Sequence, residues 1–175
     1  LKLIDAAKDD ENTVLFDLIM LGLYTGARIE ELCQLRVEDV VVEDNCRALR
    51  ITKSKTLAGT RLVPIHPGIS DLVDKLVTTS RDDFLIFSKS KNQYDERSTG
   101  LSRRFGRLKS SLGYGSELAF HSLRKTVTTK LEQAGVPEGV AADIVGHEKQ
   151  TITYGLYSGG TSMAQKVEAT TKISY

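Results

Sequence analysis

Four short groups of residues carry side chains that suit chemistry on an anion. Arg28 stands at the expected start of a helix, where free backbone N–H groups already favour negative charge. His121 and Arg124 are three residues apart and so share one face of a predicted helix. His147 follows a predicted helix end, and Tyr157 follows ten residues later. Because a guanidinium binds two phosphate oxygens at once, these residue types favour recognition of a phosphate group.

Tyr157 adds a nucleophile to this set. A phenol attacks poorly at neutral pH because its pKa is about 10, so it needs cationic neighbours or a base that takes its proton. Taken singly, each group has a plainer interpretation: a surface or ion-paired arginine, a surface or capping histidine, or a packed tyrosine. The order and spacing of the whole set indicate a shared site.

The apolar spacing predicts the elements that must position these residues. We expect a mainly α-helical α+β fold with a small antiparallel β-hairpin, formed by one domain over residues 1–175. The predicted strands are 48–53 and 61–65, joined by a basic connection, and 84–87 is predicted to be a short strand or a buried turn. The predicted helices are 12–24, 28–35, 69–78, 100–112, 121–134 and 137–145, with shorter candidates at 151–157 and 161–172.

Composition fits a soluble globular domain. The chain has 175 residues, of which 40% are hydrophobic and 27% charged. No apolar run approaches the roughly 18–20 residues of a membrane span. The acidic start over residues 1–11 excludes a signal peptide, and two cysteines are too few for a disulfide framework. We therefore expect a reducing cytoplasm and, because the chain starts at Leu1, a fragment of a longer protein.

Charge is distributed unevenly although the net charge is only +1. Residues 1–44 hold 4 basic and 11 acidic side chains, a net of −7. Residues 47–61 carry 5 basic side chains and no acid, and residues 89–109 carry 7 basic and 2 acidic ones, so each segment has a net of +5. Two such segments favour one positive face that binds a polyanion. Solvated surface charge is the alternative.

In this order the motifs resemble the catalytic domain of the tyrosine recombinases, the phage integrase family. The family's T-G-x-R-x-x-E-L segment matches residues 25–32, and its L-x-x-x-D stretch matches residues 35–39. Its H-x-x-R motif falls on His121 and Arg124, its L/V-G-H motif on residues 145–147, and its tyrosine on Tyr157. The resemblance covers residues 12–160, nearly the whole chain.

The resemblance implies cleavage and rejoining of DNA through a 3′-phosphotyrosine intermediate, with no metal and no other cofactor. Arg28 and Arg124 would hold the scissile phosphate, and His147 would donate a further hydrogen bond to it. Tyr157 would attack, while His121 would accept the tyrosine proton or orient the phosphate. A lysine of the hairpin would protonate the leaving 5′ oxygen. Glu31 would hold Arg28, or a neighbouring base, in an ion pair.

Two of these assignments leave a choice. The hairpin offers Lys53 and Lys55, which share one face of a strand, so spacing alone does not separate them. The Lys55-Thr56 step resembles the family's lysine more closely, and Lys55 is therefore the predicted acid. Tyr154 and Tyr157 are three residues apart. The family tyrosine lies nine or ten residues after the histidine, which favours Tyr157.

The resemblance also implies partners and a setting. These are double-stranded DNA at attachment sites, a homotetramer in the synaptic complex, accessory or directionality factors, and no membrane. The chain would work in a bacterial cytoplasm, associated with the nucleoid, for a phage or mobile element. Its tail, residues 161–175, would dock on a neighbouring protomer or pack on its own domain. The additional helical domain that usually precedes this one in the family is not present in the sequence.

Three other functions compete with recombination. A type IB topoisomerase-like enzyme would relax supercoils by similar chemistry, but the segments 25–31 and 146–157 resemble phage integrases more closely. A non-catalytic DNA-binding remnant is disfavoured because all the key residue types are present. A metal-dependent nuclease needs converging carboxylates, and the sequence offers no convincing triad.

Overall fold

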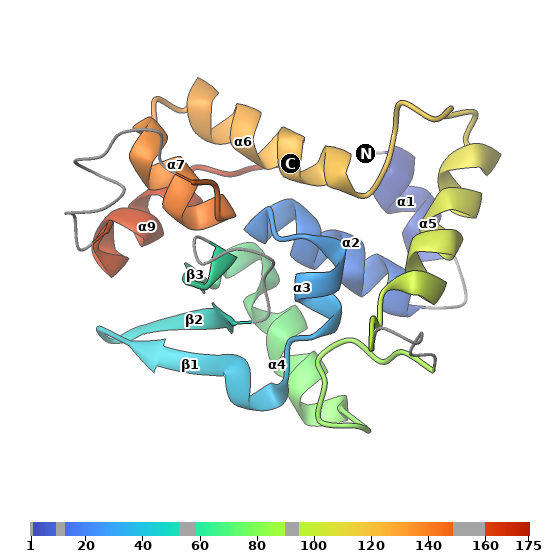
Figure 1. Cartoon of the computed structure of the whole chain (residues 1–175), viewed down its shortest axis with the longest axis horizontal. Coiled ribbons are helices and arrows are strands. Elements are labelled where there is room, and N and C mark those ends of the chain that lie inside the picture. Colours follow the sequence, from blue (N-terminus) through green and yellow to red (C-terminus); the bar gives the residue numbers. More distant parts are fainter. Residues whose placement is uncertain (1, 10–12, 53–58, 90–94, 149–159) are drawn as a thin grey trace.

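The computed structural model describes residues 2–9, 13–52, 59–89, 95–148 and 160–175. Helices make up most of it, and one small antiparallel sheet lies to one side (Figure 1). The predicted α+β class, mainly helical, is confirmed. The elements, in chain order, are α1 Lys2–Asp9, α2 Thr13–Thr25, α3 Ile29–Cys33, η1 Val37–Asp39, β1 Val40–Glu43, β2 Cys46–Ile51, β3 Arg61–Pro64, η3 Pro67–Ile69, α4 Ser70–Thr79, α5 Thr99–Ser111, α6 His121–Gln133, α7 Glu138–Val145 and α9 Met163–Thr170.

Helix α2 lies at the centre of the fold. Its sequence is apolar nearly all round, as expected of a helix buried on several sides, and Leu15, Leu18, Ile19 and Leu21 are almost fully buried. It packs against α6 along one side and against α1, α3 and η3 elsewhere (Figure 1). The helix ends at Thr25, whose hydroxyl donates to the Leu21 carbonyl and accepts from the Ala27 amide. This fixes the start of the loop that leads to Arg28.

The sheet has three strands in the order β1-β2-β3, so the predicted two-stranded hairpin was incomplete. Strands β2 and β3 pair antiparallel, with Leu49 opposite Val63, and β1 pairs with β2 through a tight turn. Asp44 and Asn45 form that turn, both with positive φ, which is the geometry that suits a two-residue hairpin loop. Strand β1 was missed because its sequence shows no alternation of apolar and polar residues, and two of its four side chains are exposed.

Residues 84–87 do not form a strand, which leaves the buried-turn alternative. They hold a single antiparallel bridge, from Phe84 to Arg36. Two guanidinium groups lie over the Phe84 ring, that of Arg97 at 3.6 Å and that of Arg36 at 4.7 Å from its centre. Two backbone hydrogen bonds, from the Leu85 amide to the Leu35 carbonyl and from the Val37 amide to the Asp83 carbonyl, hold the segment together with this stacking. The helix expected at 151–157 lies outside the described residues.

In the single chain, the segment after residue 160 packs on its own domain. Helix α9 contacts α7 and β3, and the Lys166 ammonium donates to the Leu62 carbonyl at 3.3 Å. Ile173 is buried, and the Tyr175 hydroxyl donates to the Leu23 carbonyl at 2.6 Å. Docking of the tail on a neighbouring protomer stays a prediction.

Candidate active site

Arg124 is the buried centre of the candidate site. It lies in the first turn of α6, and only 2% of the residue is exposed. Its Nη1 donates to the Gly26 carbonyl at 2.9 Å, its Nη2 to the Gly146 carbonyl at 3.0 Å and its Nε to His147 Nε2 at 3.3 Å. Among the described residues these bonds use three of its five N–H groups. The guanidinium therefore joins the loop after α2 to the end of α7 and keeps donors for a ligand.

Arg124 stays cationic at neutral pH despite its burial. Burial is the main cause that lowers the pKa of Arg124, to about 10, and the charges of Arg28 and Arg61 lower it further. A fixed positive charge in a partly dry site interacts with an anion more strongly than one in water.

Arg28 is held at the N-terminus of α3 by Glu31. The Glu31 carboxylate accepts a bond of 2.6 Å from Arg28 Nη1 and one of 2.9 Å from the Arg28 amide. The predicted ion pair between Arg28 and Glu31 is confirmed. About a third of the Arg28 side chain remains exposed, whereas Glu31 is buried. Burial alone would raise the pKa of Glu31, but the Arg61 charge and the hydrogen bonds from Arg61 and Arg28 hold it below its usual value.

His147 is placed by the C-terminus of α7. Gly146 ends the helix with φ +78°, and the Gly146 and His147 amides both donate to the Ala142 carbonyl. A positive φ favours glycine. The space at Gly146 also requires glycine, because a Cβ there would lie 2.6 Å from Arg61 Nη1. His147 is thereby turned toward Arg124 at the edge of the site.

His121 is the first residue of α6 and is exposed. Burial and then the charges of Arg124, Lys125 and Arg28 lower the pKa of His121. Burial and then Arg124, Arg28, His121 and Arg61 lower the pKa of His147. The structure thus brings Arg28, Arg124, His121 and His147 into one cationic cluster, whose charges disfavour the protonated form of both imidazoles.

This cluster leads to a prediction about its titration in the free protein. The ring signals of His121 and His147 are expected to titrate below the ordinary value of 6.5. Since the folded state then binds these protons less tightly than the unfolded chain, both groups favour folding above that value and oppose it as the pH falls. NMR titration of the imidazole protons measures the midpoints.

Arg28→Met provides the control for the titration, because the Arg28 charge lowers the pKa of both rings. Both midpoints are expected to rise in this variant. Midpoints at or above the ordinary value in the unsubstituted protein would contradict the cationic cluster.

The remaining predicted site residues lie outside the described part of the chain. These are Lys55 and Tyr157, together with the alternatives Lys53 and Tyr154.

The described neighbours of these segments are firmly held. Before β3, the Gly59 carbonyl accepts from Arg61 Nη1 at 2.6 Å. After the tyrosines, Asp143 of α7 accepts from the Thr161 amide at 2.8 Å and from the Thr161 hydroxyl at 2.6 Å.

For Arg61 and Arg97 both interpretations of the basic segments, a positive face and solvated surface charge, are wrong. Both arginines are buried, and each makes an ion pair, Arg61 with Glu31 at 3.0 Å and Arg97 with Asp82 at 2.7 Å. The alternation of side chains along a strand was a usable signal for the burial of Arg61, because Arg61 and Val63 share one face of β3 and Val63 is fully buried. Arg61 is the site residue that the sequence analysis missed.

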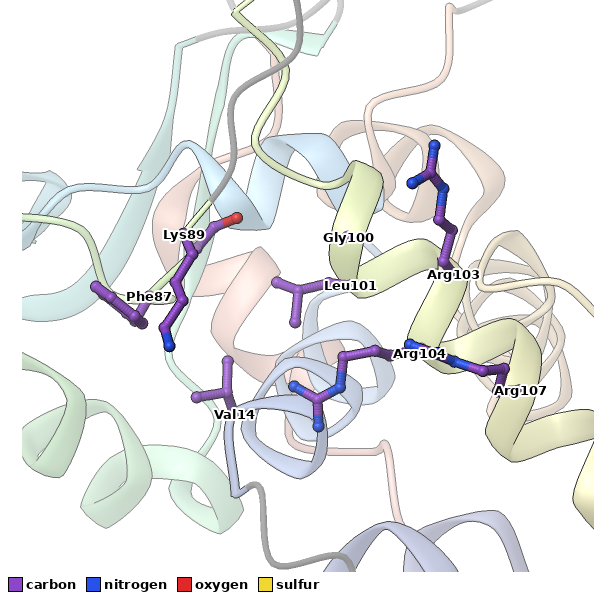
Figure 2. Close-up of a pocket in the computed structure, with 9 residues that line it drawn as sticks. Val14, Phe87, Lys89, Gly100, Leu101, Arg103, Arg104 and Arg107 are labelled. Carbon is purple, nitrogen blue, oxygen red and sulfur yellow. The ribbon is translucent and has the colours of Figure 1, made fainter.

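Other cations of the second segment line a hollow of about 640 Å³. Figure 2 shows Lys89 and Arg104 extending from two sides toward Val14, while Arg103 points away from it. Among the residues that the structure describes, the lining contains four cationic side chains and no carboxylate, which suits a polyanion. The described residues that line it are Val14, Phe87, Ser88, Lys89, Gly100, Leu101, Arg103, Arg104 and Arg107.

Helix α3 connects this basic hollow to the candidate site. The Glu30 carboxylate accepts from the Arg97 amide at 2.9 Å and from the Ser98 amide at 2.8 Å, just before α5 begins. Glu31, the next residue, binds Arg28 and Arg61. Two neighbouring carboxylates on one short helix therefore have separate tasks. Glu30 fixes the start of α5, and Glu31 holds Arg28 and Arg61.

Within the described ranges, no three histidine, cysteine, aspartate or glutamate side chains are grouped so that they could bind a metal ion. Nor does any helix there have the length and apolar character needed to cross a membrane.

The fold and the cation cluster together define the class of this protein. The sequence profile of the Phage integrase family matches residues 1–161. The chain belongs to that family.

Curated relatives support the same class. A tyrosine recombinase of Pseudothermotoga lettingae is 29% identical over 142 residues, which cover 78% of this chain and 47% of the relative. The prophage integrase IntF of Escherichia coli is 28% identical over 153 residues, which cover 84% of this chain and 31% of IntF. The chain thus spans about half the length, or less, of these relatives.

Solved structures share the fold. The integrase from mycobacterium phage Brujita superposes with a TM-score of 0.69 at 16% identity, over 99% of this chain and 56% of that one. The lambda integrase catalytic core superposes with a TM-score of 0.60 at 22% identity, over 83% of this chain and 90% of that one. A lambda integrase tetramer bound to a Holliday junction gives 0.62 at 22% identity, over 86% of this chain and 45% of that one.

Proposed function

We propose that this chain is the catalytic domain of a site-specific recombinase, which cleaves and rejoins double-stranded DNA through a 3′-phosphotyrosine intermediate. The observation that carries the proposal is the buried Arg124 guanidinium, fixed by the Gly26 and Gly146 carbonyls beside Arg28 and His147. Preorganised cations of this kind stabilise the charge that develops on a phosphodiester under attack. Membership of the phage integrase family supports the same reaction.

In the proposed reaction, the Tyr157 oxygen attacks the scissile phosphorus and the bond from phosphorus to the 5′ oxygen breaks. Arg28 and Arg124 bind the nonbridging oxygens, and His147 donates a further hydrogen bond. The tyrosine proton passes to His121, and Lys55 gives a proton to the leaving 5′ oxygen. The covalent bond to the enzyme keeps the energy of the phosphodiester. A 5′-hydroxyl from another strand can therefore reverse the step and join new DNA.

The proposed substrate is duplex DNA at attachment sites, bound in part by the basic hollow and by helix α5. We also propose that four copies assemble on paired sites, that accessory or directionality factors assist, and that the protein works at a bacterial nucleoid. We propose that the recombined DNA belongs to a phage or another mobile element. The description of a structural neighbour as a tetramer on a Holliday junction supports the assembly by analogy.

Covalent trapping tests the proposal. The chain, alone and joined to a family N-terminal domain, is mixed in EDTA with nicked suicide duplexes that carry candidate attachment-site junctions. We expect an adduct that resists SDS and that peptide mass analysis assigns to Tyr157. Bound DNA without an adduct would favour a non-catalytic DNA-binding domain. Cleavage that requires a divalent metal would favour a nuclease, and supercoil relaxation without strand exchange would favour a topoisomerase.

Neutralising the basic hollow is expected to flatten the salt dependence of DNA binding. Arg103 and Arg107 line the hollow and are exposed on α5. The double variant R103Q/R107Q therefore removes two of the hollow's four cationic side chains. Each lost phosphate contact lowers the slope of log K against log [salt] by about 0.9, so a fall of about 2 is expected. Fluorescence anisotropy at several salt concentrations measures the slope.

Lys172→Gln is the control for the salt experiment. Lys172 follows α9, which lies at the end of the molecule opposite α5 (Figure 1), and it pairs with Glu168. Its removal is expected to leave the slope unchanged. A fall of about half that size in Lys172→Gln, in proportion to the one charge removed, would mean that net charge, and not the hollow, sets the affinity.

A further inference from the structure

Arg61 connects separate parts of the candidate site. It is the first residue of β3, and 3% of its side chain is exposed. Its Nε donates to the Ile144 carbonyl at 2.7 Å, its Nη1 to the Gly59 carbonyl at 2.6 Å and its Nη2 to Glu31 Oε2 at 3.0 Å. One guanidinium thus contacts three segments that are far apart in the sequence.

Each of these segments leads directly to a group of the proposed reaction. Glu31 binds Arg28 with its other carboxylate oxygen. Ile144 precedes the Gly146–His147 turn by two residues, and the Gly146 Cα packs against the guanidinium so closely that a Cβ would overlap it. Gly59 follows the predicted lysines on the connection between β2 and β3. Arg61 therefore sets the distance between the Arg28 loop and the His147 turn.

This arrangement has an electrostatic cost that needs a reason. Burial lowers the pKa of Arg61, while the charge of Glu31 opposes that shift. The Arg61 charge also acts against the neighbouring Arg124. Well-packed apolar side chains often stabilise a core as well as, or better than, a buried ion pair. An apolar side chain has no hydrogen-bond donors and so would not hold three segments at fixed positions.

We infer that Arg61 is a positioning residue of the proposed reaction, which aligns Arg28 and the His147 turn on one phosphate through the Glu31 carboxylate and the Ile144 carbonyl. The inference rests on the proposed function. Arginine suits this role because its planar fork presents donors in several fixed directions, whereas a lysine ammonium is a single point charge. Arg61→Lys therefore keeps the charge and loses most of the alignment.

Hydrogen exchange tests the inference without any need for catalysis. In Arg61→Met, the Arg28 amide, which Glu31 binds, and the His147 amide, which Ala142 binds, are expected to exchange at least about tenfold faster through local opening. Amides in the middle of α2 are expected to keep their protection. A uniform increase across the protein, or no increase at the two amides, would overturn the inference.

Arg47→Met is the matched control for these measurements. Arg47 is also an arginine of the sheet, on β2, and pairs with Asp74, but 39% of its side chain is exposed. It contacts Ser70 and Asp74, which belong to α4 and not to the site. This variant is expected to leave exchange at Arg28 and His147 as in the unsubstituted protein.

Single-turnover cleavage of a suicide duplex gives the second readout. A misplacement of about 1 Å costs about 10²-fold in rate, so Arg61→Met is expected to lower the cleavage rate constant by about that factor, with DNA affinity within about threefold. Arg61→Lys is expected to recover part of the rate. Unchanged cleavage by Arg61→Met would overturn the inference while the recombinase proposal stands. No adduct with the unsubstituted protein would overturn the recombinase proposal, and the exchange result would still decide the alignment.

A methylphosphonate at the scissile position shows through which groups Arg61 acts. It replaces one nonbridging oxygen with methyl and removes the negative charge that Arg28 and Arg124 bind. The defect of Arg61→Met is expected to shrink to less than about fivefold on this substrate, because aligned cations matter less for a neutral phosphorus centre. An equal defect on both substrates would mean that Arg61 does not act through the phosphate-binding cations.

Discussion

Tyr157→Phe is expected to abolish the covalent DNA adduct completely. Phenylalanine keeps the ring and removes the only atom that can attack phosphorus, so no other side chain is expected to restore the bond. The loss is therefore absolute and not a rate effect. Gel analysis of suicide-duplex reactions under SDS measures the adduct, and fluorescence anisotropy is expected to show unchanged DNA affinity.

Tyr154→Phe is the matched control, because it removes a hydroxyl three residues earlier on the chain. This variant is expected to form the adduct in full. If the adduct instead disappears in Tyr154→Phe and persists in Tyr157→Phe, the chemistry stands and the choice of nucleophile is wrong. Persistence in both variants would contradict attack by either tyrosine.

Arg124→Lys is expected to lower the cleavage rate constant by about 10²–10³-fold, the usual cost of removing one preorganised donor from a developing oxyanion. Lysine keeps a positive charge but does not reach the Gly26 and Gly146 carbonyls and a phosphate together. These two carbonyls each lose a buried donor, which costs about 1–3 kcal/mol of stability per group. Single-turnover kinetics and thermal unfolding measure the two effects separately.

Two comparisons separate catalysis from folding in this variant. Lys130→Gln changes a cation in the last turn of the same helix α6, where Lys130 lies over the Tyr175 ring, and is expected to keep the full cleavage rate. Arg124→Lys is measured well below its own unfolding temperature. A folded Arg124→Lys protein with an undiminished rate would show that this guanidinium is not the phosphate ligand.

Local sequence patterns were sufficient for much of the fold and for part of the site. The apolar run of α2 and the Gly-Pro break before α7 mark helices because their causes lie within a few residues. The pair His121 and Arg124 follows from helical spacing in the same way. The ion pair of Arg28 with Glu31 also spans only three residues.

The features that the sequence did not reveal depend on distant segments. Strand alternation signals the burial of Arg61 but not its partners Glu31 and Ile144, which are 30 and 83 residues away. Arg97 reads as one of several basic residues, although its Nε binds the Cys33 carbonyl 64 residues away. No local pattern reports such partners. Strand β1 is different, because the Asp44-Asn45 pair was a usable turn signal.

The neighbouring carboxylates of α3 restrict how this family member can vary in length. Successive residues of an α-helix differ in direction by about 100°, which is why Glu30 reaches the start of α5 while Glu31 reaches Arg28 and Arg61. One residue inserted between them would turn one carboxylate away from its partners. Length changes in this part of the chain should therefore be confined to the loops around α3, and the five-residue helix itself should keep its register in every functional variant.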